Sequence, residues 1–419
     1  MKLSVPIRNI IFIWLGWAVI LLGFQSWVQM RLELKRPDSV LNWTVTETGS
    51  TSNKDQPYLS DPFLNGHVAW DSEFYLAIAD EGYAPPQVRA IPGNFGWDLA
   101  HNRYCRAGHD ANCYSLAYAF FPLYPLLIRL VAFPLGWLPI TQIATLTLAA
   151  VIVSLLGALL AMLSLYAMTR SSLGEEGGVR AAFYFLIFPS SFFLAQVYSE
   201  GVFLGVTFAA LAFLLKRKWG WAALFAVLAT WTRPGGAILL LPMAVIWIMG
   251  KTWQASRKTA LLRTLAAFSP VLSYGIWRLT PLGENFFRVE TLFFGRGLLA
   301  LDKSFGAWKN AWELMLSGSP PTRFYYGVEF AAILLGILCC CLMVRSHPAL
   351  ALYGLAMVIF ALTSGSAQGM IRYVLAAPPL FITLARWGKH AAFDKTWTLL
   401  SVLLMGLETL LFTFDFWVA

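Results

Sequence analysis

The chain has 419 residues, of which 58% are hydrophobic and only 13% charged, and its mean hydropathy is +0.62. A soluble domain carries about 25% charged residues, so this composition excludes a soluble globular enzyme, a disordered chain and a small disulfide scaffold. It indicates an integral membrane protein with many spans. The net charge of +9 comes from Lys and Arg in short clusters between apolar runs. That pattern is typical of cytoplasmic loops and not of a nucleic-acid-binding surface.

The N-terminal region predicts an uncleaved first transmembrane helix. Lys2 and Arg8 precede an apolar run over about residues 10–30, which is long enough to span a bilayer. A signal peptide also begins with basic residues and an apolar core. However, no small-x-small cleavage site follows this run, so we expect the helix to remain with its N-terminus inside.

A long, largely polar segment follows, and we assign residues 31–139 to a first outer loop. Loops of this length are usually functional. Its last part, residues 119–139, is apolar but interrupted by Pro122, Pro125 and Pro134. Because proline breaks a helix interior, we expect a helix at the outer surface or a re-entrant one, not a full span.

Hydropathy and flanking charge place the remaining spans. Together with the first helix they make about 11, with the C-terminus outside. The predicted spans are 141–169, 181–199, 201–215, 219–232, 236–250, 261–280, 324–344, 349–364, 371–386 and 396–414. The chain is therefore expected to be a single membrane domain over residues 1–419. Its transmembrane helices lie in 10–30, 141–280 and 324–414, and a second outer loop covers 281–323.

The charge distribution supports this topology. The predicted inside loops are short and basic, as the positive-inside rule requires. They contain Arg170, Arg180, Lys216, Arg217, Lys218, Lys251, Arg257, Lys258, Arg345, Lys389 and Lys395. A full span at 119–139 would invert everything downstream and place the Lys216–Lys218 cluster outside.

The segment from Trp70 to Tyr83 holds the most distinctive motif. Its apolar residues recur at helical spacing, which predicts a short interfacial helix. Asp71 stands at its start, where an aspartate often caps the helix. With Glu73 two residues on and aromatic residues around both, Asp71 is equally a candidate general base.

Polar residues interrupt the apolar sequence at further points, among them Glu200, Arg233 and Arg372. Ionisable residues at membrane depth are costly and often functional, although an arginine at a helix end can instead snorkel to the interface. The topology was assigned from the inside loops alone, yet it places these three residues, Asp71 and Glu73 on the outer side. We therefore expect one acid–arginine cleft at the outer boundary of the bilayer.

Such a cleft suits transfer of a sugar from a lipid carrier. Nucleotide sugars and ATP are absent outside the cytoplasm, so the membrane must deliver the donor, for example as a polyprenyl-phosphate sugar. A carboxylate would take the proton of the acceptor hydroxyl, and arginines would stabilise the charge growing on the lipid phosphate. A monophosphate leaving group does not require a divalent metal, and no cluster has metal-ligand spacing. We therefore predict neither a metal nor another cofactor.

The motifs resemble those of the PIG-V family, comprising GPI mannosyltransferase 2 and its prokaryotic relatives in the GT-C superfamily. The resemblance extends from Trp70 to Phe381. In chain order the matching motifs are Trp70-Asp71-x-Glu73, Ile78-Ala79-x-x-Gly82-Tyr83, Phe120-Phe121-Pro122-x-Tyr124-Pro125, Pro189-Ser190-Ser191-Phe192-Phe193, Tyr198-Ser199-Glu200, Thr232-Arg233-Pro234, Arg372-Tyr373 and Pro378-Pro379-Leu380-Phe381.

The resemblance implies an all-α polytopic membrane protein with a GT-C-type helix bundle and interfacial helices in the long first outer loop. It also implies an inverting transfer of mannose from polyprenyl-phosphate mannose to a glycolipid or glycan acceptor. Asp71 is then the expected base, with Glu73 the less certain catalytic position. Arg372 and Arg233 are candidates for the donor phosphate. Candidate substrate contacts are Trp70, Tyr83, Tyr198, Glu200, Gln368 and Tyr373.

The chain departs from eukaryotic members of the family in length and in its outer-loop insertions. The short loops are typical of a prokaryotic member, which implies an undecaprenyl- or decaprenyl-phosphate carrier. The expected location is the plasma (inner) membrane, in contact with membrane lipids, with the active site facing the outside or periplasm.

Two cysteines of the first outer loop are candidates for a disulfide. Cys105 and Cys113 are separated by seven residues, and an oxidising exterior would allow them to pair. Spacing alone does not establish the required Cα distance, so two free thiols remain the alternative.

Three other interpretations stay open from the sequence. The chain could be a transporter or flippase of a lipid-linked sugar, although such proteins tend to show paired repeats and none is evident here. It could be a non-catalytic subunit that supports another membrane enzyme. Within the enzyme interpretation, Glu73 or Glu200 could be the base, with Asp71 as the helix cap.

Overall fold

The computed structural model describes residues 4–32, 59, 61–84, 88, 90–92 and 113–418. Cys105 lies outside the described residues, so its predicted disulfide with Cys113 stays a prediction.

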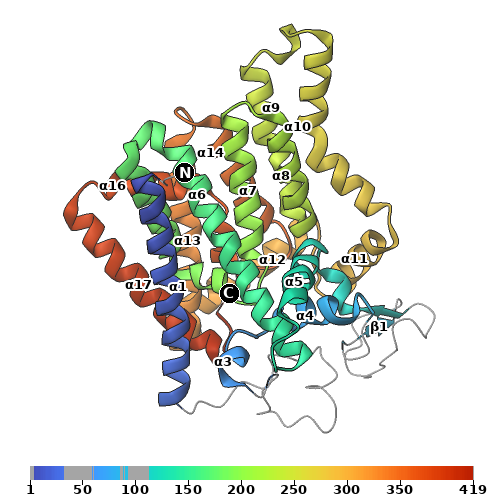
Figure 1. Ribbon diagram of the computed structural model, residues 1–419, viewed down its shortest axis with the longest axis vertical. Helices are drawn as coiled ribbons and strands as arrows, with labels where there is room; N and C mark the ends of the chain where they lie inside the picture. The colour runs from blue at the N-terminus through green and yellow to red at the C-terminus, as the bar shows by residue number, and fades with distance from the viewer. Residues whose placement is uncertain are drawn as a thin grey trace.

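The described chain is a bundle of helices with one small sheet, which confirms the all-α fold class (Figure 1). The sheet pairs β1 (Ala90–Pro92) with β2 (Cys113–Ser115) antiparallel, with Ile91 opposite Tyr114. The α-helices are α1 Val5–Arg31, α3 Pro62–Asn65, α4 Ser72–Glu81, α5 Leu123–Ala132, α6 Gln142–Leu186, α7 Glu200–Leu215, α8 Trp219–Thr232, α9 Leu240–Met249, α10 Arg257–Arg278, α11 Pro281–Leu292, α12 Leu301–Ser317, α13 Pro320–Met343, α14 Pro348–Leu362, α15 Met370–Val374, α16 Pro378–Trp387 and α17 Ala391–Thr413. The 3₁₀ helices are η2 Leu116–Ala119, η3 Phe133–Leu135, η4 Pro189–Ala195, η5 Pro234–Leu239 and η6 Thr252–Gln254.

Several helices have the length and composition of membrane spans, as expected for a multi-pass membrane protein. Within the described residues four helices qualify, namely α1, α6, α13 and α17, and a fifth span is possible if η4 and α7 act as one bent unit. The predicted count of about 11 is not confirmed. The other apolar helices have only 10–17 residues, whereas about 20 are needed to cross the hydrocarbon core.

The predicted span over residues 181–199 is wrong. The segment α6 comprises two helices joined by a kink at Gly174, whose φ is 74° and ψ 176°, and the second of them covers the start of this predicted span. This helix ends at Leu186, shortly before Pro189, which has no N–H and sterically disfavours a continuing helix. The short helix η4 then meets α7 at an angle of 101°. The bend places the first turn of α7 inside the protein.

The predicted span over residues 371–386 is also broken. It divides into α15 and α16, and the prolines Pro378 and Pro379 occupy the first turn of α16. Proline is favourable at the first helical positions but not further inside, so a new helix begins there. Residues 119–139 contain the last residue of η2, the ten-residue α5 and the short η3, in agreement with the prediction that they do not form a full span.

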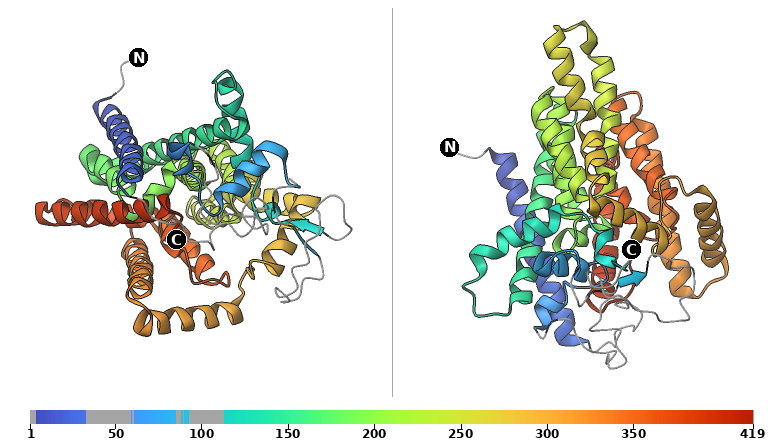
Figure 2. Two further views of the ribbon diagram at one scale, coloured as in Figure 1. Left: turned by 90° about the horizontal axis from the view of Figure 1, so that it is seen from below. Right: turned by 90° about the vertical axis from the view of Figure 1, so that its right-hand side faces the viewer.

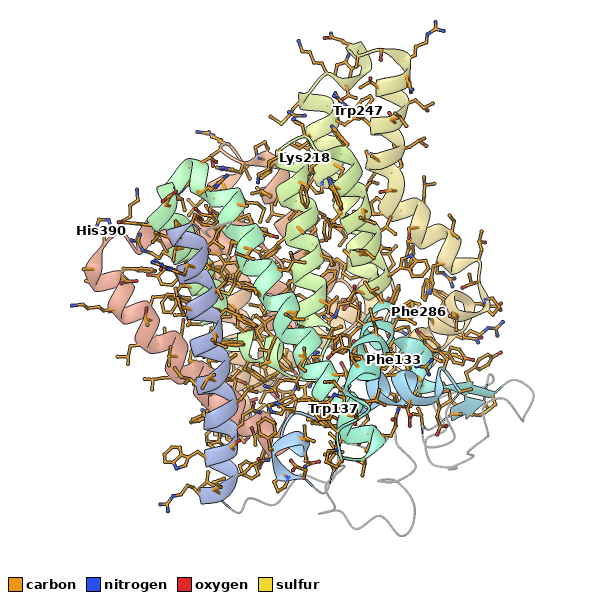
Figure 3. The ribbon with its side chains drawn as sticks, viewed as in Figure 1. Phe133, Trp137, Lys218, Trp247, Phe286 and His390 are labelled. Carbon is orange, nitrogen blue, oxygen red and sulfur yellow. The ribbon has the colours of Figure 1, made fainter. Side chains whose placement is uncertain are left out.

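The elements of the first predicted outer loop gather at one end of the bundle. Figure 1 shows α3, α4, α5 and β1 at its lower end, and the right-hand view of Figure 2 shows these blue and cyan segments low in the molecule as well. Phe133 and Trp137 lie near this end, whereas Lys218 lies at the other (Figure 3). The turn between α7 and α8 is therefore far from α4.

Close contact between α6 and α7 determines where the first turn of α7 lies. A Cβ on Gly201 would stand 2.2 Å from the carbonyl oxygen of Ser154, and one on Gly157 would stand 2.3 Å from the carbonyl carbon of Gly201. These distances are too short for any side chain. Glycine at both positions lets the backbones touch and holds the adjacent Glu200 against α6.

We predict that Gly201→Ala destabilises the protein by about 1–3 kcal/mol, because the added methyl group must push α7 away from α6. Thermal unfolding in detergent measures this change. Gly275→Ala, in the exposed interior of α10 with no neighbouring atom within 4 Å of its added Cβ, is the matched control. It should be neutral or stabilising by up to about 1 kcal/mol. Equal midpoints for the two variants would contradict the close-contact interpretation.

Candidate active site

Asp71 lies at the start of α4 with its side chain turned away from the helix. The preceding residue, Trp70, has a positive φ of 56°, which is rare for a bulky residue. The carboxylate makes no capping hydrogen bond, and its Oδ2 lies 3.9 Å from Nη1 of Arg372. The helix-cap alternative is therefore wrong. The side chain of Asp71 is 35% exposed, so its carboxylate is accessible from outside the protein.

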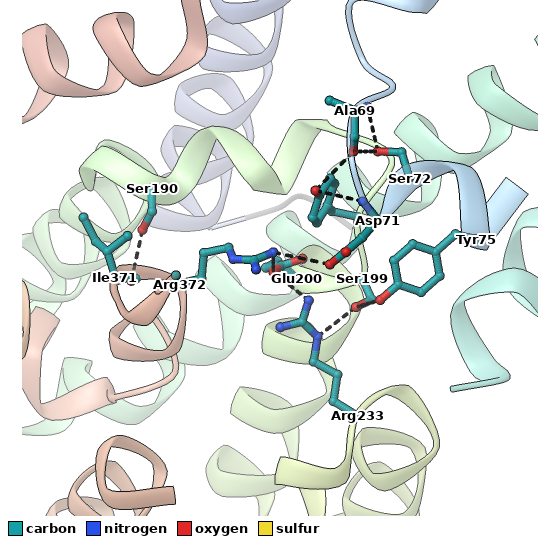
Figure 4. A network of polar contacts seen from close by, with 12 residues as sticks. Ala69, Asp71, Ser72, Tyr75, Ser190, Ser199, Glu200, Arg233, Ile371 and Arg372 are labelled. Carbon is teal, nitrogen blue, oxygen red and sulfur yellow. Dashed lines mark hydrogen bonds and ion pairs between the residues drawn. The ribbon is translucent and has the colours of Figure 1, made fainter. Parts of the chain in front are cut away.

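Tyr198 holds the backbone before α4 in place. Its hydroxyl donates to the carbonyl oxygen of Ala69 at 3.1 Å and accepts from the amide of Asp71 at 3.3 Å. Ser72 closes the same turn, because its Oγ accepts from the Ala69 amide and donates to the Ala69 carbonyl. These bonds connect Asp71 to the segment that leads into α7 (Figure 4).

Glu200 joins two arginines that come from different parts of the chain. Its Oε1 lies 2.6 Å from Nη2 of Arg233 and 3.2 Å from Nη1 of Arg372. The Glu200 side chain is 2% exposed, and those of Arg233 and Arg372 are 18% and 9% exposed. Both arginines are thus largely buried and paired with Glu200, which contradicts the snorkelling interpretation. We call Asp71, Glu200, Arg233 and Arg372 the acid–arginine cluster.

A second set of contacts orients Arg233. Its Nε donates to Oγ of Ser199 at 2.8 Å, and the hydroxyl of Tyr75 lies 2.8 Å from the same oxygen. Tyr75 belongs to α4, and burial strongly raises the pKa of its hydroxyl, so it stays protonated. These contacts link Arg233 at the end of α8 to the helix that begins beside Asp71.

Arg372 packs against aromatic rings and retains a free donor. Its guanidinium carbon lies 5.1 Å from the centroid of the Phe193 ring and 5.5 Å from that of Tyr198. Rings at this distance attract a cation. Its buried Nε and the buried Nε1 of Trp70 have no hydrogen-bond partner within the described part of the chain. Both N–H groups are available to an acceptor such as a phosphate or sugar oxygen.

The other predicted site residues differ in how close they lie to the acid–arginine cluster. Glu73 is completely buried on α4, so an entering hydroxyl meets Asp71 first. Tyr83 stacks on Tyr118 and donates to the carbonyl oxygen of Phe120. Gln368 is exposed. Tyr373 is half-buried and lies close enough to Arg233 for an electrostatic interaction.

The structure adds acids that the sequence interpretation did not identify. Glu290 of α11 is half-buried, and its burial raises the pKa of its carboxyl to about 7, with Arg296 lowering it and the charge of Asp71 raising it. It therefore titrates near neutral pH within electrostatic reach of Asp71. Glu329 of α13 lies fully buried beneath α15. Glu329 is the one charged residue in the apolar run 324–344, and this could have marked it as a site residue. Glu290 lies among other charged residues of the predicted second outer loop, where no pattern distinguishes it.

No group of three or more His, Cys, Asp or Glu side chains among the described residues has the geometry to hold a metal ion. The described site brings a partly exposed carboxylate next to two largely buried guanidinium groups.

This fold and site define a multi-pass membrane protein with a carboxylate and two arginines gathered near one end of its bundle. The predicted resemblance to the PIG-V family is confirmed, since residues 88–273 match the family described as Mannosyltransferase (PIG-V). The matched segment contains Glu200 and Arg233. It begins after Asp71 and ends before Arg372.

Two named relatives are GPI alpha-1,6-mannosyltransferases 2. The protein of Cricetulus griseus is 30% identical over 194 residues, which are 45% of this chain and 33% of the relative. That of Mus musculus is 30% identical over 187 residues, covering 43% and 32%. The chain thus aligns with about a third of the length of each.

Solved structures with a partly similar helix arrangement include an oligosaccharyltransferase and ArnT. The apo oligosaccharyltransferase of Archaeoglobus fulgidus has a TM-score of 0.48 at 14% identity, covering 97% of this chain and 56% of its own. ArnT from Cupriavidus metallidurans, bound to undecaprenyl phosphate, has a TM-score of 0.44 at 15% identity, covering 82% and 71%.

We predict that Glu200→Gln lowers the free energy of unfolding by about 3 kcal/mol or more, because it leaves two buried arginines without their shared charge. Denaturant unfolding of the purified protein measures this loss. Glu284→Gln is the matched control, because Glu284 pairs with Arg288 at the same 2.6 Å distance but is 63% exposed. An exposed pair contributes about 1 kcal/mol at most, so equal losses in the two variants would contradict the role given to Glu200.

Proposed function

We propose that this protein is an inverting glycosyltransferase of the GT-C type. It moves mannose from a polyprenyl-phosphate mannose to a glycolipid or glycan acceptor. Asp71 is the general base, and Arg372 and Arg233 stabilise the leaving lipid phosphate.

One observation carries this proposal, namely the 3.9 Å separation between the carboxylate of Asp71 and the guanidinium of Arg372. A single displacement at the anomeric carbon needs a base on the acceptor side and positive charge on the leaving-group side. The two groups must lie within the length of one sugar ring of each other. The acid–arginine cluster supplies both groups at one place, and a bound sugar would separate Asp71 from Arg372 because the base and the phosphate lie on opposite sides of C1.

The reaction is a direct substitution. The acceptor hydroxyl oxygen forms a bond to C1 of the donor sugar while the bond from C1 to the phosphate oxygen breaks. The hydroxyl proton passes to Asp71, and the electron pair of the broken bond stays on the phosphate. Attack opposite the leaving group inverts the anomeric centre. No covalent sugar–enzyme intermediate is required.

The charges of the cluster change in step with the reaction. Two carboxylates and two guanidinium groups sum to zero before transfer. When Asp71 takes the proton, it loses the negative charge that neighbours Arg372, while the leaving phosphate gains one. The guanidinium groups then act on the phosphate in a largely water-excluded site, where such preorganised charges are most effective.

The direction of the helices supports an outward-facing site. Helix α7 runs from Glu200 to Leu215, a rise of about 24 Å at 1.5 Å per residue. It separates the cluster from the basic turn Lys216–Lys218, and α8 returns from that turn to Arg233. The positive-inside rule favours the basic turn in the cytoplasm, and we therefore propose that the cluster faces the periplasmic side of an inner membrane.

The names of the relatives support mannose as the sugar and an α-linked product. The described site offers no metal-binding cluster, and the two arginines fit a monophosphate leaving group without one, so we propose transfer without a divalent metal. The proposed acceptor is a membrane glycolipid or glycan that reaches Asp71 from its exposed side.

We predict that Asp71→Asn lowers transfer by 10²–10⁴-fold, the usual contribution of a general base. The assay uses synthetic polyprenyl-phosphate mannose and a membrane-lipid extract as acceptor in liposomes. Binding of undecaprenyl phosphate should be unchanged or tighter, because the variant removes a negative charge beside Arg372.

Asp80→Asn, at the other end of the same helix, is the matched control and should retain transfer. If Asp71→Asn transfers as fast as the unaltered protein, Asp71 is not the base. Binding that falls together with transfer would instead assign Asp71 to holding the donor.

A further inference from the structure

Arg372 stands on a very short helix that cannot hold its own position. Helix α15 has five residues, Met370–Val374, and follows Gly369, whose φ is 72°. Such a short helix has little stability alone. The position of the Arg372 guanidinium therefore depends on what holds the turn before it.

A buried carboxylate from another helix holds that turn. The two oxygens of Glu329 on α13 accept from the amides of Gly369 at 2.9 Å and of Ile371 at 2.8 Å. On the other side, Ser190 donates to the carbonyl oxygen of Ile371 at 3.2 Å. The peptide groups on the N-terminal side of Arg372 are thus bound from both α13 and η4.

Tyr325, one turn before Glu329, extends this arrangement toward Asp71. Its hydroxyl donates to Glu329 Oε1 at 2.9 Å and accepts from the Gly369 amide and from Nε1 of Trp417, each at 3.1 Å. One donated and two accepted bonds use its full capacity. The Trp417 ring in turn meets the Trp70 ring edge-on, with centroids 4.6 Å apart.

Trp70 directly precedes Asp71 in the chain. These contacts therefore connect Glu329 and Tyr325 to Arg372 on one side and to Asp71 on the other. One arm runs from Glu329 through α15 to Arg372. The other runs from Tyr325 through Trp417 to Trp70 and Asp71. Arg372 and Asp71 then meet at 3.9 Å.

We propose that Glu329 and Tyr325 are positioning residues that set the guanidinium of Arg372 relative to Asp71. This inference rests on the proposed function for its effect on the donor. Glu329 accepts from the backbone amides of Gly369 and Ile371, so we assign its effect on Arg372 to the backbone of α15.

A double-mutant cycle with undecaprenyl phosphate as the probe tests this assignment on the full-length protein in detergent. Glu329→Gln keeps the shape but loses one acceptor for the two amides, so binding should weaken about tenfold. In an Arg372→Ala background the same substitution should change binding by less than twofold. Equal loss in both backgrounds, or no loss in the first, would overturn the proposal.

Two tyrosines of one helix give a milder version of the same test. Tyr325→Phe removes the central hydroxyl, and binding should weaken about threefold to tenfold. Tyr326→Phe alters a buried neighbour on α13 whose hydroxyl takes no part in the hydrogen bonds of Tyr325 and Glu329, and binding should stay within twofold. Equal effects would mean that the substitutions act through general destabilisation.

Hydrogen exchange tests the positioning without any donor. Glu329→Gln should speed exchange at the amides of Gly369 and Ile371 at least tenfold and leave Phe203–Val206 of α7 unchanged. Unchanged exchange at 369 and 371 would refute the proposal even if binding weakens. If the unaltered protein does not bind undecaprenyl phosphate, the proposed function fails, while the exchange result still decides the role of Glu329.

Discussion

The buried carboxylate of Glu200 is the interaction on which the rest of the site depends. Two guanidinium groups from separate parts of the chain would repel each other in a poorly solvated interior. Glu200 holds both, at 2.6 and 3.2 Å. A buried pair of this kind contributes little net stability but makes the loss of one partner costly. Its main consequence here is geometric, because Arg233 and Arg372 must converge on one point.

The backbone around the cluster is arranged to meet that requirement. The break at Pro189 lets α7 begin inside the protein with Glu200, and glycine contacts hold this turn against α6. The positive φ of Trp70 turns Asp71 out of its helix. The positive φ of Trp70 is locally unfavourable, as is common where strain serves a site, and all three features bring a charged group toward Arg372.

The sequence predicted the membrane class, the helix after Trp70 and the chief acids and arginines, because ionisable residues in apolar surroundings are conspicuous. It could not predict the breaks at Pro189 and Pro378, since hydropathy averages over residues that a single proline separates. The choice between helix cap and base for Asp71 depended on a side-chain rotation that spacing does not determine. Glu329 was equally visible, but its partners lie 40 and 42 residues away, and no local pattern connects them.

The most direct test is a structure by electron cryo-microscopy with undecaprenyl phosphate bound in a lipid nanodisc. We expect phosphate oxygens within about 3 Å of the guanidinium groups of Arg372 and Arg233, with Asp71 on the side away from the lipid chain. A phosphate bound elsewhere, with Glu200 still pairing both arginines and Asp71 remote from it, would contradict the assignment of the acid–arginine cluster as the transfer site.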